Sequence, residues 1–159
     1  MMKPIFESQK MPKRQRGLAA VEFTIAAPIL LMLFIGTAEL GKLLYDYNTL
    51  SKAQRNGIRY LAAQASPGQT EAAIDNTTFI DNATNLVVYG NLAGTGDPLL
   101  EGFSTDDVTF DDPTVDDVRV TVTYDYSPMI FNAVPSFGFG TPTALNFTLS
   151  SSITMRALL

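Results

Sequence analysis

LAAVEFTIAAPILLMLFIGTA, residues 18–38, is the stretch that decides how the rest of the chain can fold. Residues 23–38 of this stretch carry no charge. As an α-helix the whole stretch would be roughly 31 Å long, which matches the ~30 Å hydrocarbon core of a bilayer. We therefore predict a transmembrane helix. Pro28 removes one backbone hydrogen bond and predicts a bend near the first turns, which membrane helices tolerate.

Charge is distributed unevenly on the two sides of this stretch. The net charge is +4 over residues 1–16, +1 over residues 17–59 and −10 over residues 60–159, for a total of −5. The basic leader predicts an N-terminus that stays in the cytoplasm and an acidic remainder that is exported. An acidic exported region is repelled by phosphate backbones, which argues against nucleic acid as a partner.

Composition narrows the possible functions further. A chain of 159 residues with 46% hydrophobic and 17% charged positions has the length of one domain and is too apolar to be disordered. The sequence contains no His and no Cys. This removes Ser-His-Asp and Cys-His nucleophilic sites, thiolate or imidazole zinc sites and any disulfide. We predict that the protein is not an enzyme and has no catalytic residue, cofactor or metal site.

A helical pattern continues beyond the apolar stretch. Apolar residues recur at steps of three and four, while Lys42, Asp46 and the later basic residues fall mostly on other faces. The apolar positions are Leu40, Leu43, Leu44, Tyr47, Leu50, Ala53, Gly57, Ile58, Leu61 and Ala65. One helix is predicted from about residue 18 to about residue 65, ended by Ser66-Pro67-Gly68. Its apolar stripe packs either against the protein's own exported domain or against similar helices of neighbouring molecules.

Glu22 is a single carboxylate close to the start of the apolar stretch. On insertion scales a charged residue in hydrocarbon costs roughly 2.5 kcal/mol or more, so Glu22 should have a partner unless its placement is fortuitous. If the mature chain began at Leu18, its free α-amine could pair with Glu22 of an adjacent subunit. In a membrane such pairing would be specific, because only a docked neighbour supplies the missing charge.

Several of these segments together resemble TadE-like pseudopilins of tight-adherence (Flp, type IVb) pilus systems. The resemblance rests on Arg16-Gly17 through Glu22-Phe23, on Pro28, on Glu39-Leu40-Gly41 and on AQRNGIRYLAA at residues 53–63. It implies a precursor that a membrane prepilin peptidase cleaves between Gly17 and Leu18, with Glu22 as the family's assembly carboxylate. It also implies other pilins or pseudopilins and the inner-membrane assembly machinery as partners, in a system for secretion and adhesion. Leu18 stands where many type IV pilins have Phe, and it keeps the apolar character.

Two other processing routes compete with cleavage after Gly17. Gly36-Thr37-Ala38 offers a small-x-small pattern for signal peptidase, which would release a soluble exported binding domain beginning at Glu39. An uncleaved signal anchor is the third possibility. The apolar run of residues 23–38 exceeds the usual length of a signal-peptide core, and the helical stripe crosses Ala38 without a turn signal, so we favour Gly17.

The exported region predicts a mixture of helix and sheet. Residues 70–86 have helical spacing, and residues 90–98 are rich in turn formers. Apolar and polar side chains alternate over residues 118–126 and 145–156, and a shorter strand is predicted at 108–110. The expected fold is therefore α+β and pilin-like, a long N-terminal helix packed on a small antiparallel sheet. Its parts are a leader (1–17), a transmembrane helix (18–38), an outer continuation (39–65) and an exported domain (66–159).

Two features of the exported region suggest further roles. Asp106-Asp107, Asp111-Asp112 and Asp116-Asp117 could bind calcium, but they do not follow the EF-hand spacing, and we favour a solvated acidic edge that discourages sheet pairing. Residues 127–142 form an apolar loop that either covers the core or docks another protein. The residues that give the loop its apolar character are Met129, Ile130, Phe131, Val134, Phe137 and Phe139.

Overall fold

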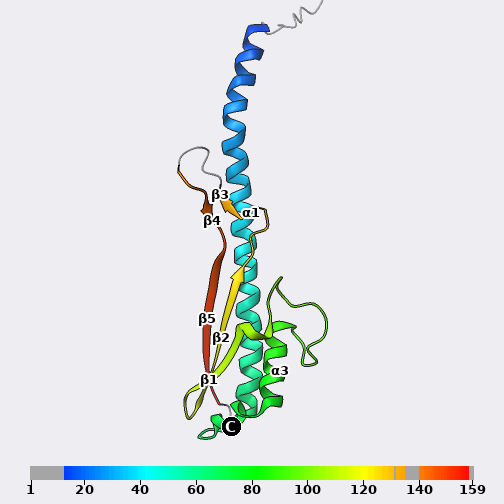
Figure 1. Ribbon diagram of the computed structural model, residues 1–159, viewed down its shortest axis with the longest axis vertical. Helices are drawn as coiled ribbons and strands as arrows, with labels where there is room; N and C mark the ends of the chain where they lie inside the picture. Colours follow the sequence, from blue (N-terminus) through cyan, green and yellow to red (C-terminus); the bar gives the residue numbers. More distant parts are fainter. Residues whose placement is uncertain (1–12, 131, 135–139, 158–159) are drawn as a thin grey trace, which may run out of the picture. The chain divides into compact units, whose positions relative to one another are not determined.

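The computed structural model describes residues 13–130, 132–134 and 140–157 (Figure 1). These residues belong to two compact units, Met1–Ala38 and Glu39–Leu159. Most of the predicted leader lies outside the described residues, as do Phe131, Phe137 and Phe139 of the predicted apolar loop.

Helix α1 runs over Lys13–Gln64 and contributes residues to both units. Its end is within one residue of the prediction, but it begins five residues earlier than predicted. The residues ahead of Gly17 are lysine, arginine and glutamine, which are good helix formers and give no reason for the helix to start later. Pro28 lies inside α1. Beyond α1, Gly68 adopts the left-handed conformation (φ 77°), which confirms the predicted helix end at Ser66-Pro67-Gly68.

Two shorter helices follow where one helical segment was predicted. They are α2 (Thr70–Ile74) and α3 (Thr77–Val88). The break falls at Asn76, whose extended backbone and side-chain oxygen cap α3 by accepting hydrogen bonds from the backbone N–H groups of Thr78 and Phe79. An asparagine cap satisfies donors that the first helical turn leaves free, so it starts a new helix within an otherwise periodic stretch. The turn-rich residues 90–98 contain no helix or strand, as predicted.

A three-stranded antiparallel sheet in the order β1-β2-β5 forms the other part of the second unit. Its strands are β1 (Val108–Thr114), β2 (Asp117–Tyr126) and β5 (Phe147–Arg156), and a 3₁₀ turn η1 (Thr105–Asp107) precedes β1. Strands β2 and β5 pair along their whole length, from Asp117 opposite Arg156 to Tyr126 opposite Phe147. The three predicted strands are thus confirmed. A separate two-stranded ladder joins β3 (Ala133–Val134) and β4 (Thr143–Ala144).

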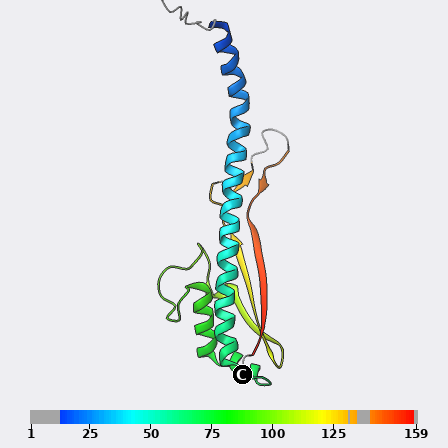
Figure 2. The same ribbon diagram turned by 180° about the vertical axis from the view of Figure 1, so that it is seen from behind.

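The core of the second unit lies between the outer part of α1, helix α3 and the sheet. Figures 1 and 2 show α3 and the sheet lying along different sides of this part of α1. Alternate residues of β2 point inward, so that Val118, Val120, Val122, Tyr124 and Tyr126 are all buried. They meet Leu50, Ile58 and Leu61 of α1 and Val87 of α3 in one cluster. The α+β, pilin-like fold expected from the sequence is confirmed.

Candidate membrane span and assembly segment

Residues 17–38 of α1, the span segment, expose apolar side chains over their whole length. None of these residues is buried, and Leu18, Phe23 and Phe34 are each about 70% exposed. The helix is long and apolar enough to cross a membrane. Burying large aliphatic and aromatic side chains yields roughly 1.5–3 kcal/mol each, so this surface requires an apolar environment outside its own unit. A single membrane pass satisfies that requirement.

The three residues singled out at the start of this segment lie within two turns of α1. Gly17 and Leu18 are helical and exposed, and a Cβ atom built at Gly17 meets nothing within 4 Å. Glu22 is also exposed. Within the described part of the chain no hydrogen bond or salt bridge joins Glu22 to another residue. The structure therefore leaves the carboxylate accessible to a partner and does not bring these three residues together with any other group.

Residues 39–64 of α1, the outer segment, bury the predicted apolar face only in part. From Leu50 onward the expected apolar positions are buried, but Leu40, Leu44 and Tyr47 are exposed. In their place Asp46 is buried, with only 5% of its surface accessible. The prediction that Asp46 lies on an outer face is therefore wrong. Its partner explains the difference, because the ammonium of Lys42 lies 2.8 Å from an Asp46 carboxylate oxygen and neutralises it.

Glu39, Lys42, Asp46 and Tyr126 form a polar cluster that we call the exit cluster, because Glu39 is the first charged residue after the apolar run. The Tyr126 hydroxyl donates to Glu39 Oε1 at 2.5 Å, and the backbone N–H of Met129 donates to the same oxygen at 3.1 Å. Lys42 Nζ donates to the backbone carbonyl of Ser127 at 2.9 Å. These hydrogen bonds thus hold the end of β2 and the residues directly after it against the first turns of the outer segment.

Aromatic contacts and burial reinforce the exit cluster. Lys42 Nζ lies 4.6 Å from the centroid of the Tyr126 ring, which in turn stacks on Phe147 with centroids 5.1 Å apart. Burial, the hydrogen bond to Glu39 and the nearby negative charges all raise the pKa of Tyr126 well above its ordinary value. Burial also raises the pKa of Tyr124, whose hydroxyl donates to the carbonyl of Glu101. Both phenols therefore remain protonated donors across the physiological range.

The sequence AQRNGIRYLAA at residues 53–63 proves to be a packing segment. Gln54 is buried and donates from Nε2 to the carbonyl of Ser151 on β5 at 2.9 Å. A Cβ atom at Gly57 would lie 2.4 Å from Val87 Cγ2 and 2.9 Å from the carbonyl oxygen of Ala83, so α3 crosses α1 at this glycine. The arginines Arg55 and Arg59 face outward. The residues that carried part of the family resemblance are thus the ones that join helix, sheet and α3.

Several of the paired aspartates hold turns and strand ends together. Asp107 caps η1 by accepting from the Ser104 N–H, and Asp111 forms a bidentate salt bridge with Arg119 across β1 and β2. Asp116 accepts from Gly68 N–H and from Arg156, which joins the α1–α2 turn to the end of β5. Arg119 lowers the pKa of Asp111 through this hydrogen bond. Hence the acidic edge is in part a structural network, which the spacing of the sequence alone did not indicate.

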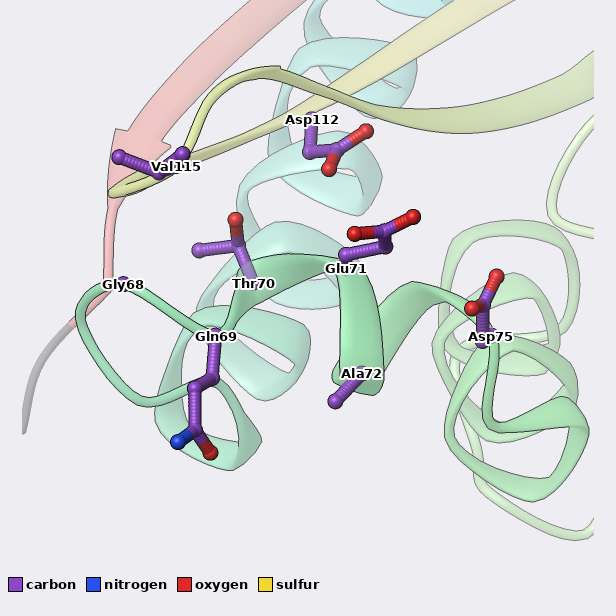
Figure 3. A pocket seen from close by; sticks show the side chains of 8 residues that line it. All are labelled: Gly68, Gln69, Thr70, Glu71, Ala72, Asp75, Asp112 and Val115. Carbon is purple, nitrogen blue, oxygen red and sulfur yellow. The ribbon is translucent and has the colours of Figure 1, made fainter.

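A shallow pocket of about 320 Å³ lies between the start of α2 and the β1–β2 turn (Figure 3). Figure 3 shows Thr70, Glu71 and Asp75 on the side of α2, and Asp112 and Val115 on the side of the end of β1 and the β1–β2 turn. Thr70 is buried and donates to the carbonyl of Thr114. Among residues 13–130, 132–134 and 140–157, no group of three or more acidic side chains is arranged to hold a metal ion. The pocket therefore gives no support to the calcium hypothesis.

The fold and the span segment define a class, a pilin-like α+β protein with one N-terminal helix that can cross a membrane. Comparison with protein families is more specific. The family described as TadE-like protein matches residues 17–59, from the glycine of the predicted cleavage site into the packing segment. The resemblance to TadE-like proteins of tight-adherence pilus systems is thereby confirmed for this part of the chain. Neither the curated proteins nor the solved structures give a match.

Proposed function

We propose that the protein is a minor pilin or pseudopilin, a structural component or assembly factor of a tight-adherence (Flp-type) pilus. In this proposal the span segment crosses the bacterial inner membrane, the basic leader stays in the cytoplasm, and residues 39–159 lie on the extracytoplasmic side. Incorporation into the pilus itself is compatible with the same arrangement. The protein acts through contacts and performs no chemical step.

One observation carries this proposal, namely the apolar surface of α1 that the protein's own domain leaves uncovered. Leu40, Leu44 and Tyr47 are exposed at successive turns and follow directly on the exposed span segment. Lipid can cover the span segment but not the later turns of the outer segment. We infer that this part of the stripe packs against α1-like helices of other pilins or pseudopilins. From Leu50 onward the stripe packs against the protein's own domain, which was the other interpretation that the sequence left open.

Processing is the first test of the proposal. A prepilin peptidase would cleave between Gly17 and Leu18, so the intact mass of the protein extracted from membranes should correspond to residues 18–159, with or without N-methylation of Leu18. Gly17→Val should leave the precursor uncut, because a side chain would crowd a site adapted to bare backbone. A mature N-terminus at Glu39 would refute the pseudopilin assignment.

Glu22 is the second test, because it is a carboxylate on the exposed surface of a predicted membrane helix. If Glu22 pairs with the α-amine of Leu18 on a neighbouring subunit, Glu22→Gln should leave membrane insertion intact or improve it, while sharply reducing piliation and crosslinking to other pilins. Thr24→Val, a change on the same segment that adds no charge, is the matched control. Accumulation of uncleaved Glu22→Gln precursor would show instead that the carboxylate serves peptidase recognition.

The alternative function is a soluble exported binding domain released by signal peptidase after Ala38. One observation favours it, because every residue of the buried core lies in the second compact unit, Glu39–Leu159, and would be retained after such a cleavage. The same mass measurement decides between the two, since the released domain would begin at Glu39 and appear in the soluble fraction.

A further inference from the structure

The connection between β2 and β5 starts and ends at the end of the domain where α1 enters it, at Glu39. Strand β2 begins near the far end of α1, because the N–H of Gly68 donates to the carbonyl of Val115 in the turn just before β2. The same strand ends beside Glu39, where the Tyr126 hydroxyl meets the carboxylate. Strand β5 starts again at Phe147, directly opposite Tyr126. Both ends of the connecting residues 127–146 are therefore fixed at the level of the exit cluster.

These connecting residues differ in charge from the rest of the exported region. Residues 126–155 contain no Asp, Glu, Lys or Arg, whereas residues 60–159 as a whole carry a net charge of −10. At the start of the connection the apolar side chains of Met129 and Ile130 are exposed, by 58% and 42%. The carboxylates near this end are Glu39 and Asp46, which are bound within the exit cluster, and Asp125, which accepts a hydrogen bond from Thr148. The connecting residues therefore add no charge of their own that an anionic bilayer surface would repel.

We propose that the start of the β2–β5 connection, Met129 and Ile130, lies in the headgroup region of the same bilayer that the span segment crosses. This inference rests on the membrane anchoring in the proposed function. Two polar contacts fix the position, since Glu39 accepts the N–H of Met129 and Lys42 donates to the carbonyl of Ser127.

This second contact has a mechanical consequence for the domain. A helix that leaves a bilayer alone allows the attached domain to tilt and rotate about it. Insertion of Met129 and Ile130 adds a second point of attachment, held to the helix by the exit cluster. The domain then presents one fixed side to neighbouring subunits, with the exposed stripe of Leu40, Leu44 and Tyr47 oriented before assembly starts.

The absence of Trp from the sequence makes a direct test possible, because each tryptophan variant carries a single indole. We would reconstitute the full chain in phosphatidylcholine–phosphatidylglycerol vesicles whose lipids carry bromine, and compare Met129→Trp with Val115→Trp. Val115 is 70% exposed and lies in the β1–β2 turn at the opposite end of the domain. Interfacial apolar side chains lie roughly 5–10 Å into the headgroup and acyl boundary. We therefore expect brominated lipid to quench the Met129→Trp variant about threefold more than the Val115→Trp variant, with its emission shifted to shorter wavelength.

A third variant separates this inference from the proposed function. Phe34→Trp reports on the span segment, and quenching of this variant without quenching of Met129→Trp would overturn the headgroup contact while leaving membrane anchoring intact. Absence of quenching in both variants would refute the anchoring itself. Emission from Met129→Trp that depends on the protein-to-lipid ratio, without quenching by bromine, would mean that a second copy of the chain covers position 129, and would also overturn the inference.

A cysteine variant guards against the possibility that tryptophan draws the loop into the membrane. The natural chain has no Cys, so Met129→Cys and Val115→Cys each introduce a unique thiol. With a membrane-impermeant maleimide, we expect vesicle-bound protein to react several-fold more slowly at position 129 than at position 115, and detergent to abolish the difference. Equal rates in vesicles would contradict the headgroup contact.

Discussion

The span segment and the outer segment belong to one helix, but the domain covers the apolar side chains of the outer segment and leaves those of the span segment exposed. In the outer segment Leu50, Ile58 and Leu61 are almost completely buried by the domain's own sheet and by α3. In the span segment every residue is at least partly exposed. Apolar content alone therefore does not reveal which surface will cover a helix.

Polar residues distinguish the two segments more clearly. In the outer segment the buried Asp46 has Lys42, and the buried Gln54 has the carbonyl of Ser151. The same chain supplies these two partners, and among the described residues only Gln54 Oε1 is a buried polar side-chain atom without one. The carboxylate of Glu22 has no such partner within the described residues, which is consistent with a partner supplied by another molecule during assembly.

The sharpest way to test this contrast is to delete equivalent side chains from the two segments. Leu61→Ala removes a completely buried side chain and should lower the free energy of unfolding of the domain by about 2–5 kcal/mol. Leu33→Ala removes a side chain that is 64% exposed and should leave that free energy almost unchanged. Chemical denaturation of the full chain in detergent, followed by circular dichroism, measures both.

A large effect of Leu33→Ala on the free energy of unfolding would contradict this expectation. If Leu33→Ala destabilised the domain as much as Leu61→Ala, the two segments would share one core and the division of α1 would be wrong. The effect that we expect of Leu33→Ala is weaker packing of α1 against neighbouring helices within the membrane, which crosslinking to other pilins can detect.

Patterns that are local in sequence could be predicted, and those that depend on distant contacts could not. Alternation of Val118, Val120 and Val122 with polar residues identified β2, and Ser66-Pro67-Gly68 identified the end of α1. The buried position of Asp46 could not be found in this way, because a charged residue is expected to face solvent. Its burial depends on the packing of β2 against α1, far away in the sequence.

The candidate site shows the same limit. Gly17 and Glu22 were predicted from a local motif, and the family match begins at Gly17. The exit cluster was missed, since Glu39 and Tyr126 come together only when β2 runs back along α1. An i, i+4 pair of Lys42 and Asp46 was the one signal within the sequence that could have indicated it.

The exit cluster, at the start of the outer segment, predicts how the free energy of unfolding depends on pH. In the unfolded chain Tyr126 ionises near pH ~10, whereas the folded domain raises its pKa and keeps the proton. The folded state therefore binds more protons above that pH. The contribution of Tyr126 to the free energy of unfolding should be constant below pH ~10 and fall as pH rises further. Tyr126→Phe should reduce this alkaline slope and cost about 1–2 kcal/mol at neutral pH, because Glu39 loses a donor.

Tyr124→Phe is the matched control for this prediction. It removes a phenol that is also buried and also has a raised pKa, but its hydroxyl contacts Glu101 and not the exit cluster. Both variants should lessen the alkaline slope, whereas Tyr126→Phe alone should increase the reactivity of a thiol at Met129→Cys in vesicles. An unchanged slope in both variants would contradict the burial of these tyrosines in the membrane-bound protein.

The smallest effect is expected far from the exit cluster, at the acidic edge of β1. Asp111 and Arg119 are each about half exposed, and Arg119 lowers the pKa of Asp111. Their salt bridge therefore contributes to the free energy of unfolding above pH ~3.9, and this contribution is lost as pH falls through the lowered pKa of the folded state. Water screens such a pair, and Asp111→Asn should therefore lower the melting temperature of the full chain only slightly at neutral pH. Asp112→Asn changes an exposed neighbour and should have no measurable effect. Millimolar calcium should shift the melting temperature no more than magnesium does at equal ionic strength. A calcium-selective rise of several degrees, abolished in the double variant Asp111→Asn, Asp112→Asn, would show that these residues bind calcium.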